Sequence, residues 1–233
     1  MNILVTGASG GIGGAICEEL HMIGNVYATG RNLSALKSLD VTDFFVCDLS
    51  CDIKSLTDFI GKNNIDVLIN NAGEYLYSEI ENLSCSDTER LYKVNLAAPT
   101  ELISAVVPNM KNKKWGRIIN IGSISGVMGE ACASVYSASK AGLIGLTKAL
   151  ALELAEYNIT VNTINPGWVD TKLGKESIED SDFSEEEILS LIPQKRFVAP
   201  SEVASLVSFL ISEEAKGITG QSINLCAGLS VGY

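Results

Sequence analysis

The chain has 233 residues, of which 46% are hydrophobic and 19% charged, a balance that excludes a disordered protein and favours one compact domain. Its 17 Lys and Arg stand against 28 Asp and Glu, and the net charge of −11 argues against nucleic acid as a partner. Six scattered cysteines without a C-x-x-C pair, and one histidine, predict neither a disulfide framework nor a metal site.

A strand-like segment at residues 2–6 begins the chain, and no basic region or long apolar stretch precedes it. We therefore expect neither a targeting segment nor a membrane anchor. We interpret the scattered cysteines as reduced packing residues, so the expected location is the cytoplasm.

Short apolar runs bounded by Gly, Asn or Asp alternate along the chain with longer stretches of helical period. This alternation predicts βαβ units around a parallel sheet, and hence one doubly wound α/β domain over 1–233. The expected strands are 2–6, 25–30, 43–47, 66–70, 116–122, 159–165 and 222–225. The expected helices lie near 11–23, 52–62, 86–111, 134–156 and 201–212.

One acidic stretch, at about 171–196, breaks this regularity because acidic side chains crowd around few apolar ones. Its acidic residues are Glu176, Glu179, Asp180, Asp182, Glu185, Glu186 and Glu187. Such a stretch is either a solvated surface excursion or a mobile lid over a substrate. Its position after the sixth strand favours the lid.

A glycine-rich turn, TGASGGIGG at 6–14, follows the first strand, and ligands of open α/β sheets bind at such strand ends. Its glycines permit a tight turn and let a pyrophosphate approach N–H groups at the helix start. The expected contacts are Gly7, Ser9, Gly11, Ile12 and Gly13. The spacing G-x-x-x-G-x-G departs from the usual dinucleotide fingerprint, and any tight strand-to-helix turn also favours glycine.

The end of the second strand bears on the cofactor, because an acidic side chain there would bind the ribose 2′-hydroxyl of NAD. Arg31 follows this strand, and no acid comes after it until Asp40. The guanidinium of Arg31 has a planar set of donors suited to phosphate, so the sequence favours NADP(H), with NAD(H) as the second choice. An ordinary surface arginine is the alternative.

Small and polar residues also end the third and fourth strands, where the adenine and ribose side of a dinucleotide would lie. They are Asp48 and Leu49 after the third strand, and Asn71, Ala72 and Gly73 after the fourth. We expect them to contact the cofactor, although such residues also commonly end strands for conformational reasons alone.

The fifth strand leads to the candidate catalytic residues. Ser123 follows it, and Tyr136 and Lys140 lie one turn apart on the same face of a long helix. A phenol with an ordinary pKa of about 10 holds its proton at neutral pH, and a neighbouring ammonium makes the phenolate easier to form. Such a pair can give a proton to a carbonyl or take one from a hydroxyl, but a half-buried tyrosine beside a solvated lysine is the alternative.

Six motifs, in this order and at these intervals, resemble the classical short-chain dehydrogenase/reductase family over essentially the whole chain. They are Thr6-Gly7-x-x-x-Gly11-Ile12-Gly13, Asn70-Asn71-Ala72-Gly73, Asn95, Ser123, Tyr136-x-x-x-Lys140 and Pro166-Gly167. The resemblance implies one Rossmann-like domain, with a seven-stranded sheet and helices on both faces. It also implies hydride transfer between a nicotinamide and a carbonyl or alcohol.

The resemblance assigns roles to four residues. Tyr136 would be the general acid in reduction, and Ser123 would hold the substrate oxygen. Lys140 would lower the pKa of Tyr136 and bind the nicotinamide ribose, so Tyr136 and Lys140 also count as cofactor contacts. Asn95 would hold a water that connects the lysine to solvent.

The segment after the sixth strand resembles the part of the family that closes over the nicotinamide. It contains Pro166, Gly167, Val169 and Thr171. The acidic stretch at 171–196 then falls where the family has its substrate lid. One departure is Gly10, because NADP-preferring members often carry a basic residue in the glycine loop.

Within the family, residues 116–145 and 218–225 look closest to β-ketoacyl-carrier-protein reductases and polyketide ketoreductases, so we predict reduction of a 3-oxoacyl thioester. An acidic carrier protein would need a local basic patch. The candidate basic residues are Lys111, Lys113, Lys114, Arg117, Lys172 and Lys175. The acidic stretch argues against that partner, and a small polar alcohol, sugar or cyclitol derivative fits the motifs equally well.

An alternative of another class is a non-catalytic nucleotide-binding protein with a regulatory role. The complete set of Ser123, Tyr136 and Lys140 argues against it.

Members of the resembled family are commonly homotetramers built through two long helices, here about 86–111 and 134–156. We therefore expect a homotetramer or homodimer. On the second helix Ala138, Ala141 and Gly145 would suit close approach of another helix, or they could face the sheet.

Overall fold

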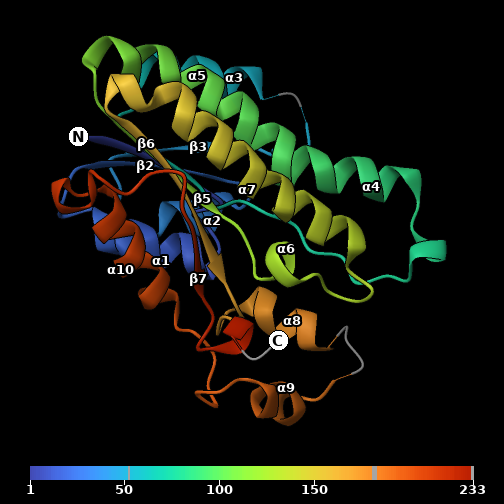
Figure 1. Cartoon of the computed structure of the whole chain (residues 1–233). Helices are drawn as coiled ribbons and strands as arrows, with labels where there is room; N and C mark the ends of the chain where they lie inside the picture. The colour runs from blue at the N-terminus through green and yellow to red at the C-terminus, as the bar shows by residue number, and fades with distance from the viewer. Residues whose placement is uncertain (52, 180–182, 232–233) are drawn as a thin grey trace.

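The computed structural model of the chain describes residues 1–51, 53–179 and 183–231. Within these residues, seven parallel strands form one sheet in the order β3-β2-β1-β4-β5-β6-β7 (Figure 1). The strands are β1 (Asn2–Thr6), β2 (Asn25–Gly30), β3 (Asp43–Val46), β4 (Val67–Asn70), β5 (Gly116–Ile121), β6 (Ile159–Pro166) and β7 (Ser222–Leu225). The expected doubly wound, seven-stranded α/β domain is confirmed.

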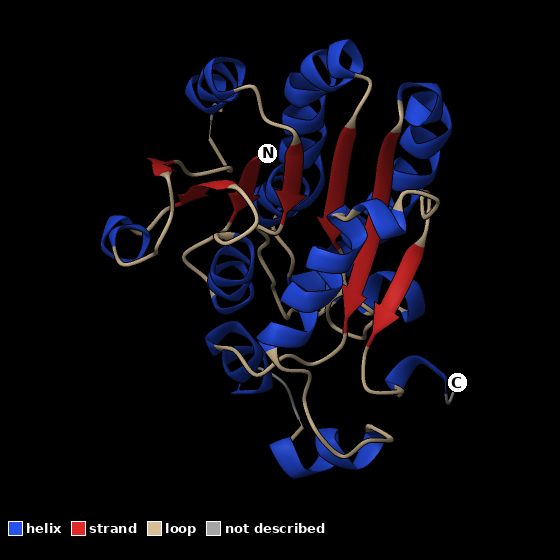
Figure 2. Cartoon of the chain, turned by 90° about the vertical axis from the view of Figure 1, so that its left-hand side faces the viewer, coloured by secondary structure: helices blue, strands red, loops and turns tan. Residues whose placement is uncertain are grey.

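Helices cover both faces of this sheet, as Figure 1 shows. The helices on one face are α1 (Gly11–Leu20), α2 (Leu33–Lys37) and α10 (Pro200–Ile211). Those on the other are α3 (Lys54–Asn63), α4 (Cys85–Tyr92), α5 (Ala98–Lys113) and α7 (Ser134–Leu154). Short helices α6 (Ser125–Met128), α8 (Lys172–Glu179) and α9 (Glu185–Leu191) lie beyond the carboxyl ends of the strands (Figure 2). Single turns of 3-10 helix occupy Ile80–Asn82, Ala155–Tyr157, Glu213–Ala215 and Leu229–Val231.

Alternate side chains of β1 enter two different apolar cores, because successive residues of a strand point to opposite faces. Ile3 and Val5 belong to the same core as Ile16 of α1, whereas Leu4 belongs to the same core as Leu102 of α5. All five are fully buried. Burial on both faces explains why these strands read as continuous apolar runs, and each such side chain contributes about 1.5–3 kcal/mol.

The helix expected at 86–111 is interrupted. α4 ends at Tyr92, a π-helical turn occupies Lys93–Ala97, and α5 continues from Ala98. π-turns inside α-helices occur frequently at functional sites, and this one contains Asn95.

The acidic stretch contains the helices α8 and α9, which were not expected. The start of α9 explains part of the acid cluster, because the hydroxyl of Ser184 accepts from the N–H of Glu187 and the carboxylate of Glu187 accepts from the N–H of Ser184. Carboxylates in a first turn also stabilise the helix dipole. A parallel bridge between Val169 and Val198 joins the two ends of the stretch. Asp180 and Asp182 lie outside the described residues.

The cysteines form no disulfide among the described residues. Cys17 and Cys226 are buried, as packing residues should be, whereas Cys51 and Cys85 are exposed, so the expectation of a packing role is wrong for these two. In the part of the chain that the structure describes, no helix has the length and apolarity to cross a membrane.

Candidate active site

A cavity of about 670 Å³ opens at the carboxyl ends of the strands, next to α8 and α9. It lies in the size range of cofactor sites, which is roughly 300–1,000 Å³. All of the expected cofactor contacts line it: Gly7, Ser9, Gly11, Ile12, Gly13, Arg31, Asp48, Leu49, Asn71, Ala72, Gly73, Tyr136, Lys140, Pro166, Gly167, Val169 and Thr171. Ser123 also lines the cavity, whereas Asn95 lies behind its wall.

The glycine loop has no room for side chains at its two closest approaches. Gly7 has a φ of +63°, and a Cβ on Gly13 would lie 2.3 Å from the carbonyl oxygen of Gly7. A Cβ on Gly11 would lie 2.7 Å from the Thr171 side chain, so the start of the acidic stretch touches the loop. Gly10, at the start of α1, provides no side-chain cap, which leaves the first N–H groups of the helix available to an anion. This cradle fits the pyrophosphate of a dinucleotide.

Hydrogen bonds from the end of β4 fix the shape of this loop. The amide of Asn71 donates to the carbonyl oxygens of Thr6 (2.9 Å) and Gly7 (3.2 Å). The backbone N–H groups of Asn71 and Ala72 both donate to the hydroxyl of Thr6, at 3.0 Å. Asn71 therefore supports the cradle as well as lining the cavity.

Arg31 lines the cavity, but an acid lies directly beside it. Its guanidinium donates to Glu74 at 2.6 Å, and Arg90 donates to both oxygens of the same carboxylate, at 2.7 and 2.9 Å. Although no acid follows Arg31 in the chain before Asp40, the fold places the carboxylate of Glu74 beside it. Glu74 comes 43 residues later in the chain. The two residues are neighbours because β2 and β4, which precede them, lie on either side of β1 in the sheet.

Asp48 is held as a carboxylate at the adenosine side of the cavity. The backbone N–H and the hydroxyl of Ser50 donate to the same oxygen, at 2.9 and 2.8 Å. These hydrogen bonds keep the pKa of Asp48 below its ordinary value.

Ser123, Tyr136 and Lys140 lie together at the other side of the cavity. Burial raises the pKa of Tyr136 to about 12, against the lowering effect of its hydrogen bond with Ser123, and the charge of Glu130 raises it further. The ammonium of Lys140 lies 5.7 Å from the ring centroid of Tyr136 and donates to the carbonyl of Ile121 at 2.9 Å. Burial lowers the pKa of Lys140 to about 8.

The lowering of the Tyr136 pKa that the resemblance implied does not occur in this structure, because burial of the phenolate dominates. The phenol consequently keeps its proton at neutral pH. It is a proton donor buried beside a serine hydroxyl, which is the arrangement that carbonyl reduction requires.

Asn95 supports this site from behind. It is fully buried, its Oδ1 accepts from the N–H of Glu74 at 2.8 Å, and its Nδ2 donates to the carbonyl of Glu74 at 2.9 Å. A Cβ on Gly73 would lie 3.2 Å from Lys140 Nζ and 3.3 Å from Asn95 Oδ1. Both polar groups therefore lie directly beside this glycine. The water-holding role remains a prediction.

Three further residues surround the catalytic side and were not found from the sequence. Tyr75 and Ser125 donate to Glu130, at 2.8 and 2.6 Å, and Ser123 donates to Ser125 at 3.0 Å. The ring of Tyr75 packs edge-on against Tyr136, with centroids 5.0 Å apart. No spacing marks these residues in the chain, because a loop, a short helix and a turn bring them together.

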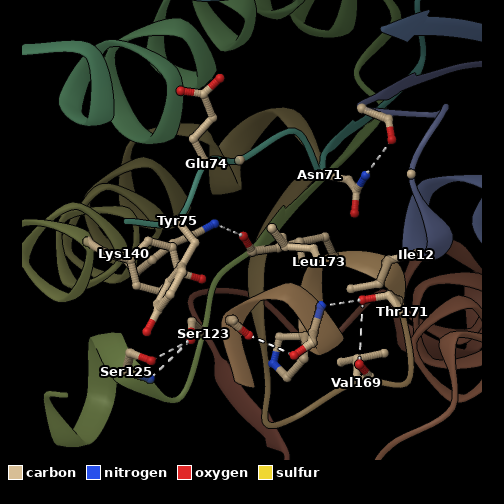
Figure 3. A pocket seen from close by; sticks show the side chains of 18 of the residues that line it. Ile12, Asn71, Glu74, Tyr75, Ser123, Ser125, Lys140, Val169, Thr171 and Leu173 are labelled. Atoms are coloured by element: carbon tan, nitrogen blue, oxygen red, sulfur yellow. Dashed lines mark hydrogen bonds between the residues drawn. The ribbon is translucent and has the colours of Figure 1, made fainter. Parts of the chain in front are cut away.

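Figure 3 shows Tyr75, Lys140, Ser123 and Ser125 on one side of the cavity, with Ile12, Asn71, Val169 and Thr171 on the other and Leu173 between them. The outer wall is apolar and includes Met128, Trp168, Leu173, Phe183, Ile188, Leu191 and Leu229. Across residues 1–51, 53–179 and 183–231, no cluster of three or more His, Cys, Asp or Glu is suited to a metal.

The candidate basic residues for a carrier protein do not form one patch, because four lie between the end of α5 and the start of β5 and two lie in α8 beside the cavity. Arg117 is fully buried and pairs with Glu213, while Lys113 pairs with Asp66. Residues 111–117 lie at the start of β5, whereas the cavity lies at the carboxyl ends of the strands. Arg117 is thus excluded from a surface patch.

A family model described as short chain dehydrogenase matches residues 1–182. The 3-oxoacyl-(acyl-carrier-protein) reductase of Rickettsia conorii is 39% identical over 97% of this chain and 95% of its own length. An uncharacterised oxidoreductase of Bacillus subtilis is 37% identical over 97% of this chain and 96% of its own.

Two solved structures extend the comparison. A variant of actinorhodin polyketide ketoreductase, solved with NADPH, superimposes with a TM-score of 0.93 at 35% identity, covering 100% of this chain and 97% of its own. A 4-hydroxyisoleucine dehydrogenase complexed with NADH has a TM-score of 0.89 at 32% identity, covering 100% and 99%.

Proposed function

Because this chain belongs to the short-chain dehydrogenase family, and is therefore an oxidoreductase of carbonyl and alcohol groups, we propose that Ser123, Tyr136 and Lys140 carry out its reaction with NADP(H). The observation that carries the proposal is the protonated, half-buried phenol of Tyr136 beside Ser123, in the cavity that the glycine loop also lines.

A nicotinamide cofactor, when bound along the glycine loop, would supply or accept the hydride. Ser123 binds the substrate oxygen, and Tyr136 gives that oxygen its proton in reduction or takes it back in oxidation. Lys140 stays beside the phenol as a cation on the carbonyl of Ile121, and Asn95 fixes the backbone of Glu74 opposite it.

Arg31 supports a preference for NADP(H). A guanidinium has five N–H donors, and the ion pair of Arg31 with Glu74 uses Nη1, so donors remain for a 2′-phosphate. The two similar solved structures differ in their cofactor, since the ketoreductase was solved with NADPH and the 4-hydroxyisoleucine dehydrogenase with NADH.

We further assign the stretch at 171–196 the role of a substrate lid. Its two helices line the cavity with Leu173, Ile188 and Leu191, and Thr171 at its start packs against Gly11 of the loop. Its contact with both the glycine loop and the catalytic side supports this role.

Two substrate classes are supported by different observations. The name of the Rickettsia relative and the apolar outer wall favour a 3-oxoacyl thioester. The carboxylate of Glu130, close to Ser123, favours the second candidate, a small polar alcohol or sugar-like compound.

The change Tyr136→Phe tests the reaction. We expect it to lower kcat for carbonyl reduction by about 10²–10⁴-fold, because it removes the proton donor and little else. NADPH titration is the control and should give a dissociation constant close to that of the wild type. Unchanged activity in the variant would contradict the proposal and favour a non-catalytic protein, while absence of turnover of acetoacetyl thioesters by the wild type would remove that substrate class alone.

A further inference from the structure

Glu130 places a carboxylate in the substrate side of the cavity. It comes directly after Gly129, whose φ of +80° turns the chain between α6 and α7. Its side chain is half-buried and lines the cavity together with Ser123 and Tyr136. The proposed hydride transfer gives this carboxylate no task.

The two hydrogen bonds to Glu130 come from neutral hydroxyls. Tyr75 donates to one oxygen and Ser125 to the other. Burial and the hydrogen bond to Glu130 both raise the pKa of Tyr75, so Tyr75 keeps its proton and remains a donor. A carboxylate has about four acceptor sites, so these two bonds orient the group without neutralising it or filling it.

No cationic side chain of the described residues pairs with Glu130. None of the salt bridges among the described residues includes Glu130. Of the three cations in the lining, Arg31 pairs with Glu74, Lys140 donates to the carbonyl of Ile121, and Lys172 forms no ion pair with Glu130. Burial is the cause of the lowered pKa of Lys140, with no opposing effect of Glu130. A partly buried charge without a counter-charge is costly unless a ligand supplies one.

Glu130 lies close to Ser123, the residue that would hold the reacting oxygen. The hydroxyl of Ser123 donates to that of Ser125 at 3.0 Å, and the hydroxyl of Ser125 donates to Glu130 at 2.6 Å. A substituent one or two carbons from the reacting carbon spans a comparable distance.

We propose that Glu130 selects substrates that carry a protonated amine one or two carbons from the reacting carbonyl or carbinol. An ammonium brings both the missing positive charge and up to three donors, and charge-assisted hydrogen bonds are roughly twice as strong as neutral ones. A hydroxyl in the same place would add a donor but no charge. This inference rests on the proposed reaction at Ser123 and Tyr136, and it narrows the class of substrate.

Three alcohols that differ in one group test this selectivity. Isopropanolamine, sec-butanol and propylene glycol carry an ammonium, a methyl and a hydroxyl at the same position. We expect kcat/KM with NADP⁺ to be at least about tenfold higher for isopropanolamine than for the other two, and this ratio to fall to near one in Glu130→Gln. Tyr75→Phe removes a hydroxyl donor but keeps the charge, so the preference should persist. Glu79→Gln removes an exposed carboxylate outside the cavity and should change nothing.

Binding gives an independent readout. Isopropanolamine should raise the Tm of the NADP⁺ complex more than sec-butanol does, and Glu130→Gln should abolish the difference. Equal shifts or equal kcat/KM values for the three alcohols would overturn the inference while leaving the reaction intact. An ammonium-specific Tm shift without oxidation of any alcohol would support the site and contradict the proposed reaction instead.

Discussion

Tyr136 is half-buried and Lys140 is buried, and loss of solvent moves their pKa values in opposite directions. The phenol is neutral when protonated, so loss of solvent favours its proton, whereas the ammonium is charged when protonated, so loss of solvent disfavours its proton. Tyr136 therefore keeps its phenolic proton across the neutral range. Lys140 loses its positive charge at a lower pH than a surface lysine would.

The pH dependence of reduction follows from this difference. Lys140 is charged below its pKa of about 8 and neutral above it, while Tyr136, with a pKa of about 12, stays protonated through that range. We expect kcat/KM for carbonyl reduction to fall as the pH rises through about 8. Lys140→Arg should shift the fall to higher pH, because a guanidinium stays protonated. A pH–rate profile measures this, and a profile that is flat through that region would contradict it.

The cofactor preference depends on Arg31. Arg31→Ala should weaken NADPH binding by about 10–100-fold, as expected for the loss of charged hydrogen bonds, and change NADH binding by less than about 3-fold. Titration by nicotinamide fluorescence measures both. The matched variant Glu74→Gln keeps Arg31 but removes the neighbouring carboxylate, so NADPH should bind at least as tightly as in the wild type. Stronger binding of NADH than NADPH by the wild type would refute the role of Arg31.

The sequence predicted the catalytic candidates better than their surroundings. Tyr136 and Lys140 share a helix, so their proximity follows from helical spacing alone. Glu74 meets Arg31 only because two strands meet across a third, and Glu130 approaches Ser123 only through a turn and a short helix. Contacts of this kind depend on tertiary packing, which no local spacing encodes.

At the scale of elements, the cofactor cradle consists of two strand ends rather than one loop. The glycines after β1 provide the space, and Asn71 after β4 provides the hydrogen bonds that hold the carbonyls of Thr6 and Gly7. The geometry of the glycine turn therefore depends on the residues after β4 as much as on those after β1.

Asn71→Ala tests this division of roles. It leaves two carbonyl oxygens without their side-chain donor, so we expect the free energy of unfolding to fall by about 1–3 kcal/mol and NADPH binding to weaken. Denaturant unfolding and cofactor titration measure the two effects. Asn109→Ala is the control, because Asn109 also donates to a backbone carbonyl, that of Ile65, but lies outside the cavity; it should lower stability without affecting NADPH. A variant Asn71→Ala that binds NADPH normally would contradict the prediction.

Strands were more predictable than helices. The expected limits of β1 and β2 agree with the observed ones, because strands buried on both faces read as uninterrupted apolar runs. The π-turn at Lys93–Ala97 was not predictable, since its residues continue the helical pattern on either side. The helices of the acidic stretch were missed because they expose most of their surface and bury few residues, such as Ile188.

At the scale of the whole molecule, one face of α7 points to assembly. Ala138, Ala141 and Gly145 are exposed rather than turned toward the sheet, and Leu152 on the same helix is 85% exposed. A Cβ on Gly145 would meet no atom within 4 Å. Exposed small and apolar residues in line on a long helix suit the close approach of another copy.

We therefore expect a homotetramer or homodimer that uses α7. Sedimentation of the wild type should give a mass of two or four chains, and Ala141→Arg should shift it toward the monomer, because a long charged side chain blocks close helix approach. Lys37→Ala is the control, because Lys37 is exposed on α2, on the opposite face of the sheet, and it should leave the mass unchanged. Sedimentation of the wild type as a monomer would refute the expectation.

The bond between Thr6 and Asn71 also has a consequence for the growing chain, because these residues are 65 positions apart. At about 5–20 residues per second, the glycine turn spends several seconds outside the ribosome before its partner strand is synthesised. During that interval its carbonyls are bonded to water and the turn has no fixed shape. A nascent chain that ends before Asn71 should therefore gain no protease resistance from NADPH.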